Sequence, residues 1–173
     1  DLMGLVDLVA LATVADVVPL TGVNRAFVQR GLRAMAEGAR PGIAALAAEA
    51  GLADAPEAHH LGFVLGPRIN AGGRVGRADL GARLLATDDA SEAATLAVDL
   101  ERLNAARRQV EAEVREAALA QAEARGVAAP LVWAAGDGWH PGVVGIVAAR
   151  LKEAFNRPAV VIGFDGADGK GSG

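Results

Sequence analysis

The segment that most constrains this chain is the stretch 91–125, which contains neither proline nor glycine. An apolar residue recurs in it every seven positions, at Leu96, Leu103, Val110 and Ala117, with Leu100 and Val114 between them and Arg107 and Gln121 as interruptions. This spacing predicts one helix about 50 Å long, capped by Ser91 and ended by Gly126. A coiled-coil strand or a strut between two lobes would fit it. We favour the strut, because a different pattern begins directly afterwards.

That following pattern predicts a βαβ unit. Residues 131–135 form a short apolar run and 136–139 a turn. A helical segment occupies 141–155, and a run rich in Val and Ile occupies 159–164. A strand, a helix of this length and a second strand favour a right-handed parallel unit.

Helices are expected before the strut. Residues 2–15 are apolar nearly all round, which is typical of a buried helix, and this helix should end near Asp16, ahead of Pro19. A second helix is expected over 24–37, with Asn24 as its cap and Gly38 as its stop. A third is expected over 41–51, and 53–58 is a polar connector.

Composition narrows the class of protein. The chain has 173 residues, 52% of them hydrophobic, a net charge of −4 and no cysteine. Disulfides, thiolate zinc sites and cysteine nucleophiles are therefore excluded, and a protein that is basic all over is disfavoured. No apolar run is long enough for a membrane helix, and no secretory signal is present. We expect a cytoplasmic protein without membrane partners, and an internal piece of a longer protein.

The first candidate functional residue is Asp16. An acid that ends a buried helix among Val14, Val17 and Val18 needs a partner to stay ionised. A helix cap, an arginine or a metal ion could each provide one. Asp7, inside the same helix, is a similar but weaker case.

The second candidate is the run 65–77, which has three arginines, four glycines and no acid. Glycines let backbone N–H groups approach an anion, and guanidinium groups match phosphate oxygens. A phosphate-binding loop and an ordinary solvated turn both fit this run. The candidate residues are Arg68, Asn70, Gly72, Gly73 and Arg74.

Two further segments carry weaker signals. His140 precedes the proline that opens the helix 141–155, so it could meet an anion at the helix N-terminus or simply cap it. Its neighbour Trp139 could stack on a base or cover the strand end. The Gly-Lys-Gly-Ser-Gly run 169–173 is similar to a phosphate cradle but lacks the Walker pattern. The adjacent His59 and His60 favour a helix start over a metal site.

Together these segments resemble the RecJ single-stranded-DNA exonucleases of the DHH phosphoesterase superfamily. The resemblance rests on the stretches 7–20, 24–25, 65–74, 140–148 and 170–173, which follow one another in the same order. It implies an α/β fold in three parts. Residues 1–88 would be the mostly helical C-terminal part of a DHH lobe with a cleft-facing Gly/Arg loop. Residues 89–126 would be the connecting helix, and residues 127–173 the start of a βαβ DHHA1 lobe.

The resemblance also implies roles for residues. Asp16 would be a metal ligand and, with His140, a catalytic residue. The candidates of the run 65–77 would bind substrate phosphate, as would His140, Gly142 and Ser172. The implied activity is 5′-to-3′ hydrolysis of single-stranded DNA by two Mn²⁺ or Mg²⁺ ions in DNA repair and recombination. The implied partners are a single-strand-binding protein and a RecQ-type helicase.

The chain also departs from the family pattern, and these departures bear on its activity. The family's N-terminal acidic motifs and its Asp-His-His triplet are absent, and one carboxylate cannot hold two divalent ions. We therefore expect this chain alone to be catalytically inert. Two alternatives stay open. One is another DHH phosphodiesterase acting on oligoribonucleotides or cyclic dinucleotides. The other is a non-catalytic DNA-binding or replisome scaffold of the same fold.

Overall fold

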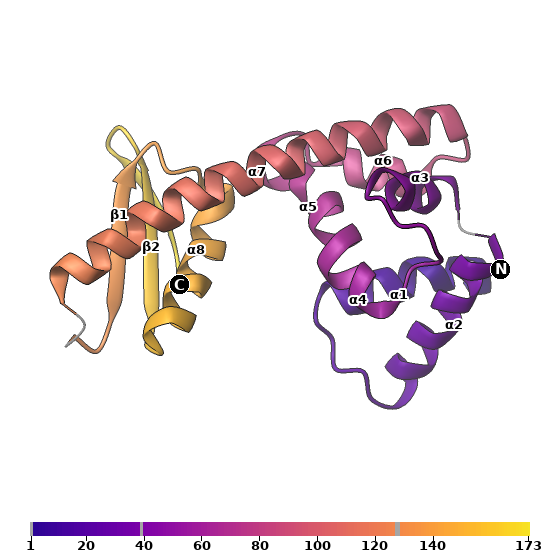
Figure 1. Cartoon of the computed structure of the whole chain (residues 1–173), viewed down its shortest axis with the longest axis horizontal. Coiled ribbons are helices and arrows are strands. Elements are labelled where there is room, and N and C mark those ends of the chain that lie inside the picture. Colours follow the sequence, from indigo (N-terminus) through magenta and orange to yellow (C-terminus); the bar gives the residue numbers. More distant parts are fainter. Residues whose placement is uncertain (1, 39, 127–128) are drawn as a thin grey trace. The chain divides into compact units, whose positions relative to one another are not determined.

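The computed structural model describes residues 2–38, 40–126 and 129–173. It divides into two compact units, residues 1–104 and 105–173, which are described separately below. Figure 1 shows the elements in chain order. The α/β class and the mostly helical first part agree with the prediction. The predicted boundary at residue 127 lies outside the described residues.

All regular elements described in the first unit are helices. Its elements are η1 (Leu2–Leu5), α1 (Val6–Ala15), α2 (Gly22–Gly38), α3 (Pro41–Glu49), α4 (Ala58–His60), the π-helical η2 (Leu61–Leu65), α5 (Gly66–Val75), α6 (Asp79–Ala86) and the first half of α7 (Ala90–Arg125). The three helices expected before residue 52 are present. Two expectations were wrong. Asn24 is not a cap, because α2 begins two residues earlier and the Asn24 amide donates to the Pro19 carbonyl. The run 65–77 is mostly helix rather than loop.

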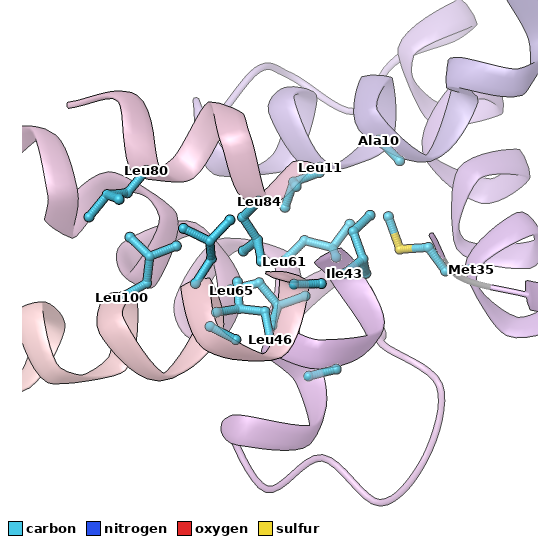
Figure 2. Packing of buried hydrophobic residues seen from close by; sticks show 14 of the residues in the cluster. Ala10, Leu11, Met35, Ile43, Leu46, Leu61, Leu65, Leu80, Leu84 and Leu100 are labelled. Carbon is cyan, nitrogen blue, oxygen red and sulfur yellow. The ribbon is translucent and has the colours of Figure 1, made fainter. Parts of the chain in front are cut away.

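Leucines from five helices make the core of this unit (Figure 2). Leu46, Leu61, Leu65, Leu84 and Leu100 each expose 1% of their surface or less. They come from α3, η2, α6 and α7, and Leu11 of α1 packs against the same cluster. The continuous helical stretch from η2 into α5 is therefore fixed from several sides.

Helix α1 buries only one face, contrary to the expectation of a helix enclosed all round. Val6, Asp7, Ala10 and Leu11 are buried, whereas Val9 exposes 40% of its surface and Ala12 is also exposed. The buried face meets α2 at Gly31, where an added Cβ would collide with the Ala10 side chain and the Val6 carbonyl. A glycine at this position thus permits the close approach of two helix backbones.

Asp7 has an arginine partner. Arg40 donates from Nε to Asp7 Oδ2 at 2.6 Å and from Nη2 to Oδ1 at 2.9 Å, and it also reaches the carbonyls of Gly4 and Leu85. Burial alone would raise the pKa of Asp7. The Arg40 hydrogen bond and charge and the Leu8 N–H outweigh burial and hold that pKa below its usual value.

The end of α1 is a Schellman turn with an unusual residue in it. The N–H of Val18 donates to Thr13 O at 3.0 Å, and the N–H of Val17 donates to Val14 O at 3.1 Å. Val17 adopts a φ of +57°, in the left-handed region where this motif normally places glycine. A β-branched residue there costs roughly 1–2 kcal/mol. The turn also leaves Asp16 exposed at the helix end, so the expected burial of Asp16 was wrong.

Helix α7 confirms the predicted long helix and contributes to both cores. Ala93, Leu96, Ala97 and Leu100 lie in the first core, and Val114, Ala118 and Ala122 in the second. The predicted stripe is one residue off at its C-terminal end, because Ala118 is buried and Ala117 is exposed. The cap is Asp89 rather than Ser91, since the Asp89 carboxylate accepts from the N–H groups of Ser91 and Glu92. Gly126 follows the helix with a φ of +82°, as a C-terminal glycine should.

The second unit is a three-stranded sheet packed against helices. Its remaining elements are β1 (Val132–Asp137), α8 (Pro141–Phe155), β2 (Ala159–Asp165) and β3 (Asp168–Ser172). β1 and β2 pair in parallel, with Val132 opposite Ala159, which confirms the βαβ prediction. β3 pairs with β2 antiparallel, and Gly166, with a φ of +59°, lies at the first position of the two-residue turn between them. The run 169–173 therefore belongs mainly to strand β3.

A side chain of α7 bonds to the outer edge of β1. Gln121 Nε2 donates to the Ala135 carbonyl at 2.8 Å, and Gln121 Oε1 accepts from the Ala135 N–H at 3.1 Å. One turn later, Arg125 donates to the Trp133 carbonyl and lies 3.8 Å from the centre of the Trp133 ring. Across the described ranges, no helix has both the length and the apolar character needed to cross a bilayer.

Candidate functional site

Asp16 and Asn70 line one pocket in the first unit, although they are far apart in sequence. The pocket has a volume of about 290 Å³. Its walls are Leu8, Leu11, Ala12, Ala15, Gly66, Ile69 and Leu85. An exposed carboxylate and an exposed amide thus share one otherwise apolar hollow. This is the arrangement that the sequence could suggest only through the resemblance.

Glycine at position 66 allows this juxtaposition. A Cβ on Gly66 would lie 3.1 Å from the Ala15 Cβ and 2.8 Å from the Leu61 carbonyl. The N-terminus of α5 therefore approaches the last residue of α1 closely, which brings Asn70 of α5 to Asp16. Asn70 and Arg74 are one turn apart, so they lie on the same face of α5.

Arg68 lies on a different side of α5 and has partners within the protein. Its guanidinium forms an ion pair with Glu101 of α7 and donates to the Val64 carbonyl at 2.8 Å. Only 13% of its side chain is exposed. Arg68 therefore ties α5 to α7, and Glu101 already neutralises its charge.

The glycines of α5 differ from one another. Gly72 is buried, and an added Cβ would lie 2.6 Å from the Arg77 carbonyl. Gly73 is exposed and has open space beside it. Arg74 is exposed next to it. Of the two glycines, only Gly73 presents its backbone to solvent, and it does so near Asn70.

His140 caps α8 in the second unit. Its Nδ1 accepts the N–H of Gly142 at 3.0 Å, and its carbonyl accepts the N–H of Val143. Since Pro141 has no N–H, the donors of the first turn are already used. Nδ1 is an acceptor here, so the proton of the neutral ring lies on Nε2, which can still donate.

The other candidates of the second unit lie around α8. The Ser172 hydroxyl lies against Gly145, where a Cβ would approach it to 3.0 Å. Trp139 packs over Gly136 of β1, and its carbonyl approaches Gly163 of β2. Trp139 thus covers the strand ends, the simpler of the two roles considered for it.

The paired histidines form a helix start, as expected. Glu57 caps α4, and its N–H donates to His60 Nδ1 at 3.0 Å. Within residues 2–38, 40–126 and 129–173, no group of three His, Cys, Asp or Glu side chains could hold a metal ion. Asp16 and Asn70 supply two oxygen ligands, whereas Mg²⁺ and Mn²⁺ usually take six. These two residues alone do not make a metal site.

Sequence reasoning missed one residue that lines the pocket and one conformation beside it. Leu85 lines it from α6, a helix that was not predicted, although the spacing of Leu80 and Leu84 carried a helical signal. The left-handed Val17 next to Asp16 had no signal at all, since valine is a poor residue for that conformation.

No protein-family profile matches the chain. Its sequence is 46% identical, over its whole length, to the single-stranded-DNA-specific exonuclease RecJ of Dickeya dadantii. It is 43% identical to RecJ of Escherichia coli over its whole length, and 39% identical to RecJ of Bacillus subtilis over 98% of it. The chain matches part of RecJ. It spans 31% of the Dickeya and Escherichia proteins and 22% of the Bacillus protein.

Solved RecJ structures agree with the fold. RecJ of Thermus thermophilus in complex with Mg²⁺ superposes with a TM-score of 0.85 at 39% identity. That match covers 93% of this chain and 25% of the Thermus chain. An exonuclease RecJ bound to manganese gives a TM-score of 0.83 at 40% identity, covering 93% of this chain and 40% of the other. The resemblance inferred from the sequence motifs is thereby confirmed.

Proposed function

We propose that this chain is part of a longer single-stranded-DNA-specific exonuclease that hydrolyses DNA from the 5′ end by two-metal catalysis. The observation that carries the proposal is the pocket shared by Asp16 and Asn70. It occurs in a chain 39–46% identical to six RecJ proteins over nearly its whole length.

In this proposal Asp16 is a ligand of a divalent ion, Mn²⁺ or Mg²⁺, as well as a catalytic residue. Asn70, Gly73 and Arg74 hold the substrate backbone, because they share one exposed face of α5 beside that carboxylate. Gly72 supports them through close packing.

The proposed roles in the second unit are more limited. His140 retains an Nε2–H that can donate to a phosphate, while its Nδ1 caps α8. Gly142 acts through that cap, because its N–H is already donated. Ser172 is an exposed residue and offers a hydroxyl group. Arg68 acts indirectly, by fixing α5 through Glu101.

The remaining ligands must come from elsewhere in the longer protein. The described residues provide no group of three ligating side chains, and the pocket offers one carboxylate. We therefore propose that this chain alone does not hydrolyse DNA. Its proposed setting is cytoplasmic DNA repair and recombination, with a single-strand-binding protein and a RecQ-type helicase as partners.

The decisive test is Asp16→Asn in the full-length protein, assayed by Mn²⁺-dependent release of nucleotides from a 5′-phosphorylated single strand. The matched control is Asp54→Asn, because Asp54 is an exposed aspartate in the connector before α4. We expect Asp16→Asn to lower kcat by roughly two orders of magnitude or more and Asp54→Asn to leave it unchanged. Equal kcat values for the two variants would show that Asp16 is neither a metal ligand nor a catalytic residue.

Two further arms test the alternatives. Dinucleotides or cyclic dinucleotides that are cleaved faster than long single strands would indicate another DHH phosphodiesterase. A full-length protein that binds single strands without cleaving them would indicate a scaffold. Digestion of DNA by the 173-residue chain on its own would contradict the proposed incompleteness of the site.

A further inference from the structure

Val17 adopts a conformation that folding alone does not favour. It occupies the left-handed position of the Schellman turn, with a φ of +57°, where glycine would carry no steric penalty. The two hydrogen bonds of the turn involve backbone atoms only, so glycine would form them equally well. The valine side chain therefore adds strain to the turn without adding a bond.

Packing does not compensate for this strain. Val17 exposes 86% of its surface, more than any other large hydrophobic residue described in this chain. An exposed isopropyl group gains nothing from the core, because apolar stabilisation scales with the area removed from water. Valine at this position thus has a steric cost that no packing against the core offsets.

The surroundings of Val17 suggest a ligand. Asp16, its direct neighbour, lines the pocket shared with Asn70. The connection to α2 and the first turns of that helix expose further apolar side chains, namely those of Val18, Leu20, Val23 and Phe27. Arg25 is exposed among them. Exposed apolar side chains with a basic group near them in the chain are typical of sites that bind single-stranded nucleic acid, where apolar groups meet bases and cations meet phosphates.

We propose that the Val17 side chain contacts the base or deoxyribose of the nucleotide whose phosphate lies beside Asp16 and Asn70. This inference rests on the proposed function, because it takes single-stranded DNA as the ligand. Val17 then contributes to substrate binding, and the binding contact offsets the strain at φ +57°, which leaves an apolar group exposed next to Asp16.

A rival explanation is that valine stiffens the turn and so positions Asp16. Val17→Ala separates the two explanations. Alanine keeps a Cβ, and with it most of the backbone restriction, but loses the two methyl groups that would meet the nucleotide. Val17→Gly removes both the contact and the strain.

The experiment measures kcat and KM of the full-length protein on a 5′-phosphorylated single strand, and the Tm of the 173-residue chain. If Val17 contacts the nucleotide, we expect both variants to raise KM about tenfold and to leave kcat within about twofold of the wild type. The reason is that each variant removes apolar groups from the contact with the substrate. Val17→Gly should also raise Tm, by about 2–4 °C. Val98→Ala, at a half-exposed valine of α7, should leave both KM and kcat unchanged.

Three other outcomes would contradict the proposed contact between Val17 and the nucleotide. If Val17→Ala matches the wild type and only Val17→Gly lowers kcat, Val17 positions Asp16 and the contact is refuted. If neither variant changes KM or kcat while the wild type digests the strand, this inference fails and the proposed function stands. If the wild type neither binds nor digests single strands, the proposed function fails and the inference with it.

Discussion

The ion pair between Asp7 and Arg40 offers a sharp test of how the first unit is held together. Two short hydrogen bonds join the groups, and Arg40 also reaches carbonyls before α1 and at the end of α6. Only 10% of the Asp7 side chain and 22% of the Arg40 side chain are exposed. The pair therefore links three segments in a setting where solvent screens it weakly.

The expected loss follows from this geometry. Asp7→Ala leaves a mostly buried guanidinium without its carboxylate, and breaking such a pair typically costs about 3–5 kcal/mol. Arg40 keeps some contact with water, so we expect about 3 kcal/mol, at the lower end. We expect about 3 kcal/mol for Arg40→Ala and about 4 kcal/mol for the double variant, which implies a coupling of about 2 kcal/mol.

Urea unfolding of the chain at pH 7, followed by far-UV circular dichroism, measures these losses. Tryptophan fluorescence is unsuitable, because Trp133 and Trp139 both lie in the second unit while the pair lies in the first. Additive single losses, with no coupling, would refute the view that the two side chains act as a unit. A loss well below 1 kcal/mol for Asp7→Ala would show that the pair is effectively solvated.

Acidification provides an independent check. The folded-state pKa of Asp7 lies below its ordinary value, so the stabilisation is complete above the unfolded pKa of about 3.9. It is lost as the pH falls through the lower, folded-state value. The stability difference between wild type and Asp7→Ala should therefore be constant near neutral pH and shrink below about pH 4. A difference that persists unchanged into strong acid would contradict this assignment.

Two further predictions concern glycines and arginines. Gly31→Ala should destabilise the chain by about 1–3 kcal/mol through the collision with α1, whereas Gly73→Ala should be neutral or stabilise it by up to about 1 kcal/mol, as measured by urea unfolding. Arg74→Ala should weaken single-strand binding by the full-length protein and make log K against log salt shallower by about 0.7. Arg68→Ala should mainly lower stability, because the mostly buried ion pair between Arg68 and Glu101 is lost. If the salt slope of Arg74→Ala equals that of the wild type, Arg74 does not contact phosphate.

Much of the fold could be predicted from local patterns. The long helix followed from the absence of helix breakers over 91–125, and the parallel pairing of β1 with β2 followed from two apolar runs around a helix. The end of α2 at Gly38 followed from the presence of glycine, the residue that most often terminates helices. These features depend on residues close together in sequence, which is why the sequence alone was sufficient.

The errors arose where tertiary contacts overrode local preference. The glycines in 66–73 favour a loop in isolation, but Gly66 and Gly72 are used for close packing, so the segment is helical. Asp16 is flanked by valines, which suggested burial, yet the Schellman turn leaves it at the surface. The pocket that joins Asp16 to Asn70 depends on η2 and α5 packing against α1, and neither spacing nor composition carries that information.

Gln121, which interrupts the apolar stripe of α7, determines at which edge the sheet can pair with a further strand. Its amide occupies the N–H and carbonyl of Ala135 on the outer margin of β1, much as an adjoining strand would. That margin is thereby shielded from pairing with another chain, a hazard that unprotected strand edges carry. Any strand that widens this sheet must then add beside β3, where Gly169, Lys170 and Gly171 leave the backbone accessible.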